Sequence, residues 1–318
     1  MNRRQFLFCT AATLAGTACS GGIVSRAESA ETWPTAIRAT TPQKALVTWY
    51  SQTGHTRRIG RLIGKVLEKE GLQVTALPLA EVDTTALPGY DLLVLGTPVY
   101  YFDVPVNVAA WLRRLPALTG IPAASFVTFG GEGSNPHNTA VRLLRLLADR
   151  GAVPVGLSIY ANMSTYAPTW SMGSAARTLA YRDLPDEKTF ERARAEARAI
   201  ADRVRRGQAI RPDKEFNAGE IWRLLDSQDW TRMLISGHRI NEQKCIRCGT
   251  CVRTCPAGAI RLDPARIDHR ACLACFGCVN NCPADAQEMR FLRYPVQGFE
   301  SFKKAHAVTT REPAELLG

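Results

Sequence analysis

Apolar positions follow two different periods between residues 44 and 207. Five short apolar runs rich in strand-forming residues predict β-strands at residues 44–50, 73–77, 91–96, 124–129 and 153–160. Between these runs, apolar residues recur at helical spacing, which predicts helices through residues 59–67, 106–115 and 138–150, and a last helix that ends at Gly207. Strands that alternate with helices in this way predict an α/β fold: a doubly wound, parallel five-stranded sheet covered on both faces.

Three loops of the predicted sheet carry residues suited to a ligand. In such sheets ligands bind beyond the carboxyl ends of the strands. The loop after the first strand combines hydroxyl groups, a glycine and the free N–H groups of a helix N-terminus, which suit a phosphate: Ser51, Thr53, Gly54, His55 and Thr56. The loop after the third strand carries aromatic residues: Thr97, Pro98, Val99, Tyr100, Tyr101 and Phe102. The loop after the fourth strand contains Gly130 and Gly131, and an aromatic stretch at 160–170 is expected to cover a ligand or to pack the connection.

These three loops, in this order, resemble flavodoxin. The resemblance implies that Ser51, Thr53, Gly54, His55 and Thr56 hold the phosphate of FMN. It also implies that Thr97, Pro98, Val99 and Tyr100 line one edge of the isoalloxazine ring, with Tyr101 or Phe102 near its face and Gly130 and Gly131 at the opposite edge. A flavodoxin-like fold that binds no flavin and serves for docking is the alternative.

Eight of the ten cysteines lie between residues 245 and 282, in two runs of one spacing, C-x₂-C-x₂-C-x₃-C-P. This spacing resembles the bacterial-type ferredoxins with two clusters, in which the fourth cysteine of each run binds the other cluster. The resemblance implies one [4Fe–4S] cluster on Cys245, Cys248, Cys251 and Cys282, and another on Cys272, Cys275, Cys278 and Cys255. Disulfides and zinc are the alternatives. A duplicated spacing with proline after each fourth cysteine is not typical of disulfide frameworks, and zinc-binding C-x₂-C pairs do not come as triplets.

The first residues predict export. Arg3 and Arg4 precede a short apolar run and then small residues, which is typical of a secretory signal peptide and resembles a twin-arginine signal over residues 1–27. The twin-arginine route carries folded cargo, which suits a protein that acquires its clusters before export. Cys19, within this segment, is an alternative candidate as a lipidation site. We expect the mature chain in the periplasm, soluble or at the membrane surface, because no later segment reaches the length of a membrane span.

The net charge of +11 would by itself suggest nucleic-acid binding. Residues 1–27 contain three arginines and no acid, so +8 is left without them. The negative charge of the clusters and of the FMN phosphate offsets most of the remainder, and we therefore expect no nucleic-acid partner. Arg247 and Arg253 lie within the first cysteine run and are expected to favour the reduced, more negative form of a cluster.

Together these features predict five segments. They are a signal peptide (1–27), a flavodoxin-like FMN-binding domain (42–207), a linker (208–236), a small α+β dicluster ferredoxin domain (237–290) and a tail without a recognisable motif (291–318). The whole resembles flavodoxin–ferredoxin fusion proteins. The resemblance implies an exported electron carrier that passes electrons between FMN, two [4Fe–4S] clusters and a partner, which is a redox protein or a membrane oxidoreductase. The alternatives are a flavin-dependent reductase of a small acceptor such as a quinone, and a dicluster ferredoxin with a flavin-free docking domain.

Overall fold

The computed structural model describes residues 32–131, 134–225 and 228–317. The predicted signal peptide, residues 1–27, lies outside the described residues. Trp33–Gly318 form one compact unit, so the predicted linker does not separate two independent bodies. The positions of the proposed domain boundaries remain predictions.

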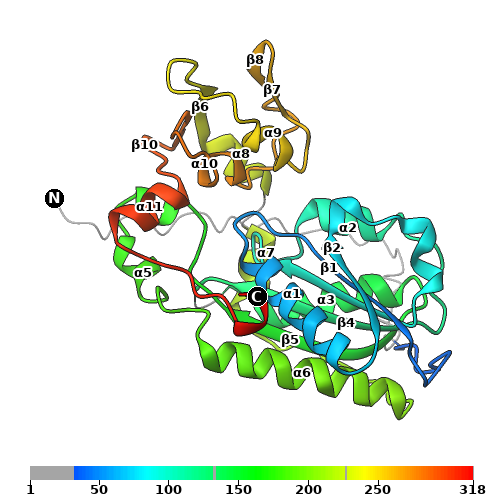
Figure 1. Cartoon of the computed structure of the whole chain (residues 1–318). Helices are drawn as coiled ribbons and strands as arrows, with labels where there is room; N and C mark the ends of the chain where they lie inside the picture. Colours follow the sequence, from blue (N-terminus) through cyan, green and yellow to red (C-terminus); the bar gives the residue numbers. More distant parts are fainter. Residues whose placement is uncertain (1–31, 132–133, 226–227, 318) are drawn as a thin grey trace, which may run out of the picture. The chain divides into compact units, whose positions relative to one another are not determined.

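A five-stranded sheet forms the centre of the larger part of this unit (Figure 1). All five strands are parallel and pair in the order β2-β1-β3-β4-β5. This is the predicted flavodoxin-like fold, in which the strand order reverses beside β1 and opens a crevice at the carboxyl ends of the strands. All five predicted strands are confirmed, within about two residues at each end: β1 Lys44–Trp49, β2 Gln73–Pro78, β3 Leu92–Pro98, β4 Pro122–Phe129 and β5 Val153–Ala161.

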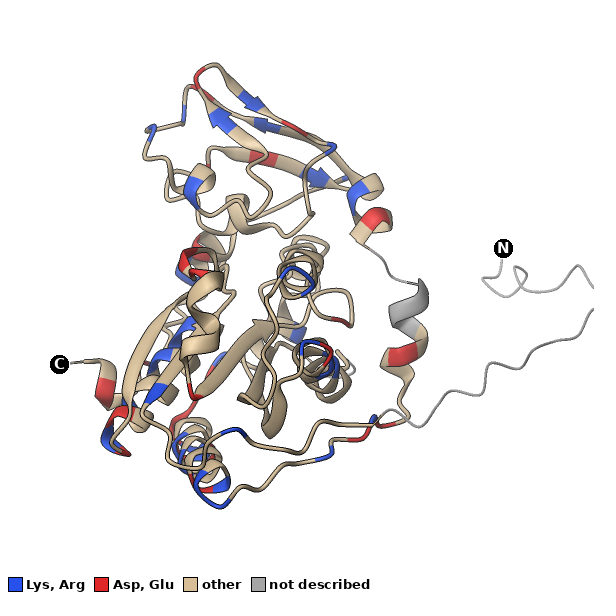
Figure 2. Ribbon diagram, turned by 90° about the vertical axis from the view of Figure 1, so that its right-hand side faces the viewer, with Lys and Arg blue, Asp and Glu red and all other residues tan. Residues whose placement is uncertain are grey.

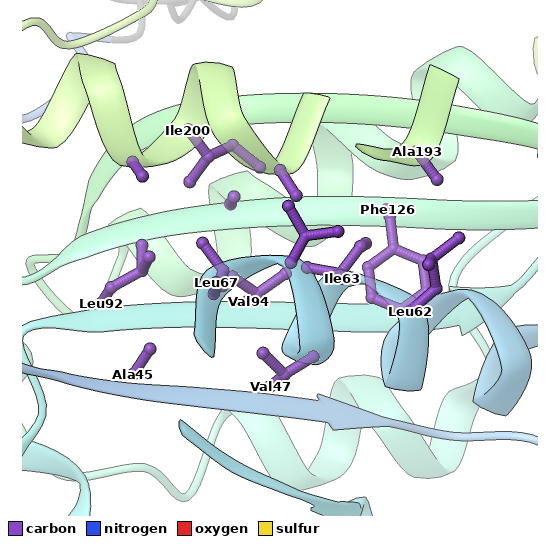
Figure 3. Close-up of a cluster of buried hydrophobic side chains, with 14 of the residues drawn as sticks. Ala45, Val47, Leu62, Ile63, Leu67, Leu92, Val94, Phe126, Ala193 and Ile200 are labelled. Carbon is purple, nitrogen blue, oxygen red and sulfur yellow. The ribbon is translucent and has the colours of Figure 1, made fainter. Parts of the chain in front are cut away.

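Helices cover both faces of the sheet. Helices α1 (His55–Lys69) and α6 (Glu187–Arg205) pack on one face, where Ile63, Ile200 and Phe126 belong to one buried apolar cluster (Figure 3). Helices α2 (Val106–Leu112) and α3 (Pro136–Ala148) contribute to a second apolar cluster on the opposite face. Successive residues of β1 alternate between the two clusters, because side chains of a strand point to opposite faces in turn.

Short elements follow two strands of the sheet and precede the small domain. Two 3₁₀ turns, η1 (Leu79–Glu81) and η2 (Thr84–Gly89), follow β2, and two short helices, α4 (Pro168–Ser171) and α5 (Ala175–Leu179), follow β5. The predicted linker contains helices α7 (Ala218–Leu225) and α8 (Gln228–Leu234), and the first strand of the small domain begins two residues before the predicted boundary.

The small domain is α+β with antiparallel strands, as predicted. Strands β6 (Ile235–Ile240), β9 (Gln287–Phe291) and β10 (Tyr294–Pro295) form a sheet in the order β10-β9-β6. Strands β7 (Ile260–Leu262) and β8 (Ala265–Ile267) form a separate hairpin. Two one-turn helices lie within the cysteine runs, α9 (Thr250–Arg253) and α10 (Gly277–Asn280).

The tail folds back against helices of the larger part. Its helix α11 (Phe299–Ala305) stacks the ring of Phe302 on Trp170 at 4.7 Å between ring centroids. Beyond α11, Glu312 forms an ion pair with Arg58 of α1 at 2.7 Å, and Glu315, in the 3₁₀ turn η3 (Ala314–Leu316), pairs with Arg194 of α6 at 2.7 Å. A segment without a sequence motif therefore ties the two parts of the unit together. Within the described residues no helix is both long and apolar enough to span a membrane.

Candidate functional site

The loop between β1 and α1 forms an anion site at the N-terminus of a helix. Gly54 caps α1 with a φ of 92°, a left-handed conformation that favours glycine. The first turn of α1 carries no acidic residue, so its free N–H groups and helix dipole are available to a phosphate. Thr56 is buried, with its hydroxyl 2.8 Å from that of Thr128. The loop thus has a geometry that suits a phosphate, and its role as the phosphate site stays a prediction.

His55 is neutral and lies at the base of this loop. Burial, followed by the nearby charges of Arg58 and Lys303, lowers the pKa of His55 from 6.5 to about 3. Its ring packs against Phe299 of the tail at 5.8 Å between centroids, and its Nε2 is buried without a hydrogen-bond partner among the described residues. Because this ring also lines the cavity described below, its unsatisfied nitrogen fits a polar ligand.

The second loop presents aromatic side chains from a strained turn. Tyr101 and Phe102 have φ angles of 50° and 61°, which bulky residues rarely adopt. The amide of Asn135 donates a hydrogen bond to the carbonyl oxygen of Phe102 at 3.0 Å and so supports this turn. Burial raises the pKa values of Tyr100 and Tyr101 well above 10, so both phenols stay protonated.

The third loop needs its glycines. A Cβ atom at Gly130 would lie 2.3 Å from the Cα atom of Ser164, so the loop after β4 and the segment after β5 approach more closely than any side chain allows. Gly131 has a φ of 120°, again a conformation that favours glycine. Both glycines line the cavity.

A cavity of about 320 Å³ lies among these three loops. Its walls combine aromatic rings with hydroxyl and amide groups, which suits a flat aromatic ligand with a polar tail. Of the predicted flavin residues, most line it: Ser51, Thr53, His55, Thr56, Pro98, Val99, Tyr100, Tyr101, Phe102, Gly130 and Gly131. Gly54 and Thr97 do not. Gly54 makes the turn, and Thr97 is fully buried within β3, so the contact of Thr97 with the ring stays a prediction.

Sequence reasoning missed part of the wall. Among the residues after β5, Asn162, Tyr166 and Arg177 line the cavity, and Arg177 is the one full charge among its described lining residues. The aromatic stretch at 160–170 was the available signal, and its residues divide between both expected roles. Tyr166 lies at the cavity, whereas Tyr160 and Trp170 are buried in apolar clusters.

The eight cysteines of the described residues are free thiols that fall into two sets. Burial, and then the neighbouring thiolates of Cys282 and Cys245, raise the pKa of Cys251. Burial, and then the thiolates of Cys275, Cys272 and Cys255, raise the pKa of Cys278. The fourth thiol of each run therefore lies near thiols of the other run. The assignment of four thiols to each cluster stays a prediction.

We call Cys245, Cys248, Cys251 and Cys282 the outer set, because Cys248 is exposed. Cys255, Cys272, Cys275 and Cys278 form the inner set, because Cys275 lines the cavity. Burial is the main cause of the raised pKa values of Cys272, Cys275 and Cys278. Buried thiolates held side by side are costly unless a cationic centre binds them, so the donor sets fit iron–sulfur clusters.

The two cysteine runs share one backbone geometry. Arg247 and Ala274, which occupy equivalent positions, have φ angles of 54° and 52°. The backbone N–H four residues after the last cysteine of each run donates to that cysteine's sulfur, at 3.3 Å from Ala259 and 3.2 Å from Ala286. Such N–H groups stabilise sulfur that carries negative charge, as it does when iron is bound.

His238 contacts the inner set, which the sequence did not indicate. Its Nε2 lies 3.4 Å from the sulfur of Cys278, and its ring packs on His269 at 5.8 Å. Its side chain is buried, and burial is the main reason that its pKa falls from 6.5 to about 4. A neutral ring that donates from Nε2 would form an N–H···S bond to a cluster ligand.

The cavity and the inner set share one wall. Ala274, Cys275 and Phe276 line the cavity together with the loops after β1, β3 and β4. The phenol of Tyr101 donates to the carbonyl oxygen of Ala274 at 2.7 Å. Gln52, in the phosphate loop, is held by both cysteine runs. Its side-chain Nε2 donates to the backbone carbonyl oxygen of Thr254 at 3.2 Å, and its backbone carbonyl oxygen accepts from the side-chain amide of Asn281 at 2.9 Å.

Two known families match this chain. Residues 47–195 match the family described as Flavodoxin, and residues 238–283 match the family described as 4Fe-4S dicluster domain. A curated relative, "Flavodoxin" of Clostridium saccharobutylicum, is 24% identical over 167 residues, which are 51% of this chain and 98% of the relative.

Solved flavodoxin structures match the same half of the chain. A flavodoxin from the domain Archaea is 17% identical with a TM-score of 0.41, and the match covers 51% of this chain and 99% of that one. Oxidised Flavodoxin 2 from Bacillus cereus is 23% identical with a TM-score of 0.39, and the match covers 50% and 99%.

The chain therefore joins a flavodoxin domain to a 4Fe-4S dicluster domain, and it is an electron-transfer protein. The first domain implies FMN as a cofactor, and the second implies two iron–sulfur clusters. In this chain the cavity walls fit the flavin, and the inner and outer sets of cysteines fit the clusters.

Proposed function

We propose that this chain is an exported electron carrier that passes electrons internally between FMN in the cavity and the two clusters, and then to a redox partner. One observation carries the proposal: Cys275, a member of the inner set, lines the same cavity as the phosphate loop and the aromatic loop. Electron-transfer rates fall steeply with distance, so a cluster ligand in the wall of a flavin site favours direct transfer between the two.

The contacts around this wall support a fixed geometry. Tyr101 holds Ala274 through its hydroxyl group, and Gln52 contacts both cysteine runs. The side chain of Asn280, in α10, donates to the carbonyl oxygen of Thr165 at 2.9 Å and so holds the segment after β5 as well. Three elements of the flavin cavity are thereby bound directly to the cysteine runs.

The difference between the sets supports an order along the path. The inner set is adjacent to the cavity, whereas the outer set includes the exposed Cys248. The proposed path runs from the cavity through the inner set to the outer set and then to the partner, or in the reverse direction. FMN exchanges electrons singly or in pairs, and each cluster exchanges one, so the two clusters together match one fully reduced flavin.

The proposal includes export, with residues 1–27 as the signal peptide. Arg3 and Arg4, followed by the short apolar run, support the twin-arginine route and a periplasmic location. Fusion of the first 40 residues to a reporter that needs this route provides the test. The Arg3→Lys, Arg4→Lys double variant should abolish export of the reporter, and unchanged export would contradict this part of the proposal.

The internal path is tested by single-turnover kinetics on the anaerobically purified protein. Its iron, sulfide and FMN contents are measured first. The flavin is then reduced by a light flash, and the absorbance of the flavin and of the clusters is followed. We expect flavin oxidation and cluster reduction to proceed together at a rate independent of protein concentration. A flavin that stays reduced beside oxidised clusters would contradict the proposal, and steady turnover of a soluble quinone would favour the reductase instead.

Two cysteine variants test the order in which electrons pass through the inner and outer sets. Cys248→Ser alters only the outer set, so the first electron should still leave the flavin at the wild-type rate while the second is retained. Cys275→Ser alters the inner set and should abolish the fast phase. If a variant fails to assemble, the concentration independence of the wild-type rate still tests internal transfer. Loss of the fast phase in Cys248→Ser with its inner cluster intact would contradict the proposed order.

A further inference from the structure

The exposed outer set is surrounded by apolar and basic side chains. Cys248 is exposed, and its neighbours Ile246 and Val252 are 66% and 38% exposed, respectively. Exposed apolar side chains beside a redox centre allow another protein to approach it closely. The exposed Cys248 thus lies within a small apolar patch.

Two arginines of this patch carry charge that no carboxylate neutralises. Arg247 donates to the carbonyl oxygen of Leu262 at 3.1 Å, and Arg253 donates to that of Cys248 at 2.9 Å. Both side chains are exposed, and neither forms an ion pair within the described residues. Neutral acceptors therefore hold both guanidinium groups in place and leave their charge available to a partner.

The adjoining hairpin adds two more exposed arginines, one of which, Arg266, lies near the carboxylate of Asp268. Arg261 of β7 lies directly opposite Arg266 of β8, and both are exposed (the small domain's Lys and Arg positions are blue in Figure 2). Like charges directly opposite each other destabilise a β-hairpin. The hairpin's acids are Asp263 and Asp268, and the carboxylate of Asp268 accepts the backbone N–H groups of Arg270 and Ala271. An anionic partner would offset the repulsion between the two arginines.

We propose that this surface docks an acidic redox protein, which exchanges one electron with the cluster of the outer set. We call it the basic exit face; it consists of Ile246, Arg247, Val252, Arg253, Arg261 and Arg266 around Cys248. The proposal rests on the function proposed above and adds the chemistry of the partner. In each encounter one electron leaves the reduced cluster and enters the partner's cofactor, and neither a bond nor a proton changes place.

The surroundings of Cys248 favour a protein over a lipid surface. A membrane surface would attract the arginines but would offer no acceptor beside the exposed cysteine. An acidic redox protein satisfies both features, because charge complementarity steers the encounter and the apolar patch lets the two cofactors approach. Electron transfer to such a partner should therefore slow as salt screens the charges.

The test compares two forms of one redox protein: basic cytochrome c and its succinylated, acidic form. Clusters of the holoprotein are reduced with dithionite, excess reductant is removed, and haem reduction is followed by stopped flow at several salt concentrations. We expect the second-order rate constant for the acidic form to fall about tenfold from low to physiological ionic strength, and that for the basic form to rise. A salt-independent rate constant for the acidic form would overturn the proposal.

Two charge-reversal variants locate the face. Arg247→Glu with Arg253→Glu should slow reduction of the acidic cytochrome about tenfold at low salt. The control pair, Arg198→Glu with Arg206→Glu, makes the same change of net charge on and beside α6, away from the cysteine runs, and should have little effect. New carboxylates beside a cluster lower its potential and make it a stronger reductant, so a slower reaction cannot come from the change in potential. Equal slowing by both pairs would overturn the proposal.

Further measurements separate the remaining outcomes. Electron transfer from the flavin to the clusters is recorded in every variant without cytochrome. If this transfer does not occur, the proposed function is contradicted. The reaction that starts from dithionite-reduced clusters still tests the basic exit face in that case. Sedimentation with phosphatidylglycerol vesicles tests the lipid surface. Vesicle binding that Arg247→Glu with Arg253→Glu abolishes, together with unchanged cytochrome kinetics, would overturn the proposal in favour of a membrane. If this pair fails to assemble clusters, Arg261→Glu with Arg266→Glu takes its place, with the same expected result.

Discussion

Tyr101 donates a hydrogen bond to the carbonyl oxygen of Ala274 at 2.7 Å, across 173 residues of the chain. Tyr101 comes from the aromatic loop of the flavodoxin domain, and Ala274 precedes Cys275 of the inner set. The same phenol also lies close enough to the side chain of Thr231, in α8, to share a hydrogen bond with it. The bond to Ala274 is the contact that joins the cavity wall directly to the second cysteine run.

Tyr101→Phe removes this bond and keeps the ring. We expect the free energy of unfolding to fall by about 1 kcal/mol, because the buried carbonyl oxygen of Ala274 loses its donor. We also expect flavin-to-cluster transfer to slow, because the wall that carries Cys275 is less firmly held. Urea denaturation without oxygen and flash photolysis measure the two effects. Tyr90→Phe is the control, since no hydrogen bond of the Tyr90 hydroxyl occurs in the described structure; equal effects of both variants would contradict the prediction.

Gly277→Ala tests the contact between the phosphate loop and the second cysteine run. A Cβ atom at this position would lie 1.8 Å from Oε1 of Gln52, so the amide of Gln52 must move and lose its bond to Thr254. We expect a loss of about 1–3 kcal/mol in unfolding free energy and weaker FMN binding. Fluorescence titration with FMN and urea denaturation measure them.

The double variant Gln52→Ala, Gly277→Ala provides the matched control. Removal of the Gln52 side chain makes room for the new methyl group. Adding Gly277→Ala to Gln52→Ala should therefore lower the unfolding free energy much less than Gly277→Ala alone does. An undiminished cost would mean that the damage comes from the α10 backbone and not from Gln52.

His238→Leu tests the contact with the inner set. We expect the reduction potential of that cluster to fall by about 40 mV, the equivalent of one hydrogen bond of about 1 kcal/mol for one electron. The potential falls because an N–H donor to Cys278 stabilises the reduced, more negative cluster. A redox titration followed by electron paramagnetic resonance measures it. His269→Leu removes the neighbouring ring without touching a sulfur, and a shift of the same size there would refute the interpretation.

Glu312→Gln tests the tail. The side chain of Arg58 is buried and pairs with Glu312 at 2.7 Å, so its charge would lose a charged partner. We expect the unfolding free energy to fall by roughly 1–3 kcal/mol. Glu300→Gln breaks a pair on the same tail that is more exposed than the Arg58 pair, with 52% of Glu300 and 19% of Lys303 accessible, and it should cost less than about 1 kcal/mol. Thermal denaturation of both variants measures the difference, and equal midpoints would be evidence against an anchoring role of the tail.

Local patterns in the sequence were enough to predict the sheet, its main helices and the two sets of cysteines. Strand alternation and helical spacing are properties of neighbouring residues, and the spacing of the cysteine runs carries the resemblance to dicluster ferredoxins that implies which thiols share a cluster. The Tyr101–Ala274 bond, the role of Gln52 and the Arg58–Glu312 pair join residues more than 170 positions apart. Such pairs leave no periodic trace in one sequence, so the shared wall and the anchored tail could not be predicted.

The contact between His55 and Phe299 has a consequence for the order in which the chain is made. Phe299 and Glu312 emerge from the ribosome after both cysteine runs, yet they complete the surroundings of His55 and Arg58. The helix that begins at the phosphate loop therefore reaches its final environment only once the cysteine runs have been synthesised. During translation the flavin domain is thus completed after the cluster domain. A chain interrupted before residue 299 would lack the side chains that pack against His55 and Arg58.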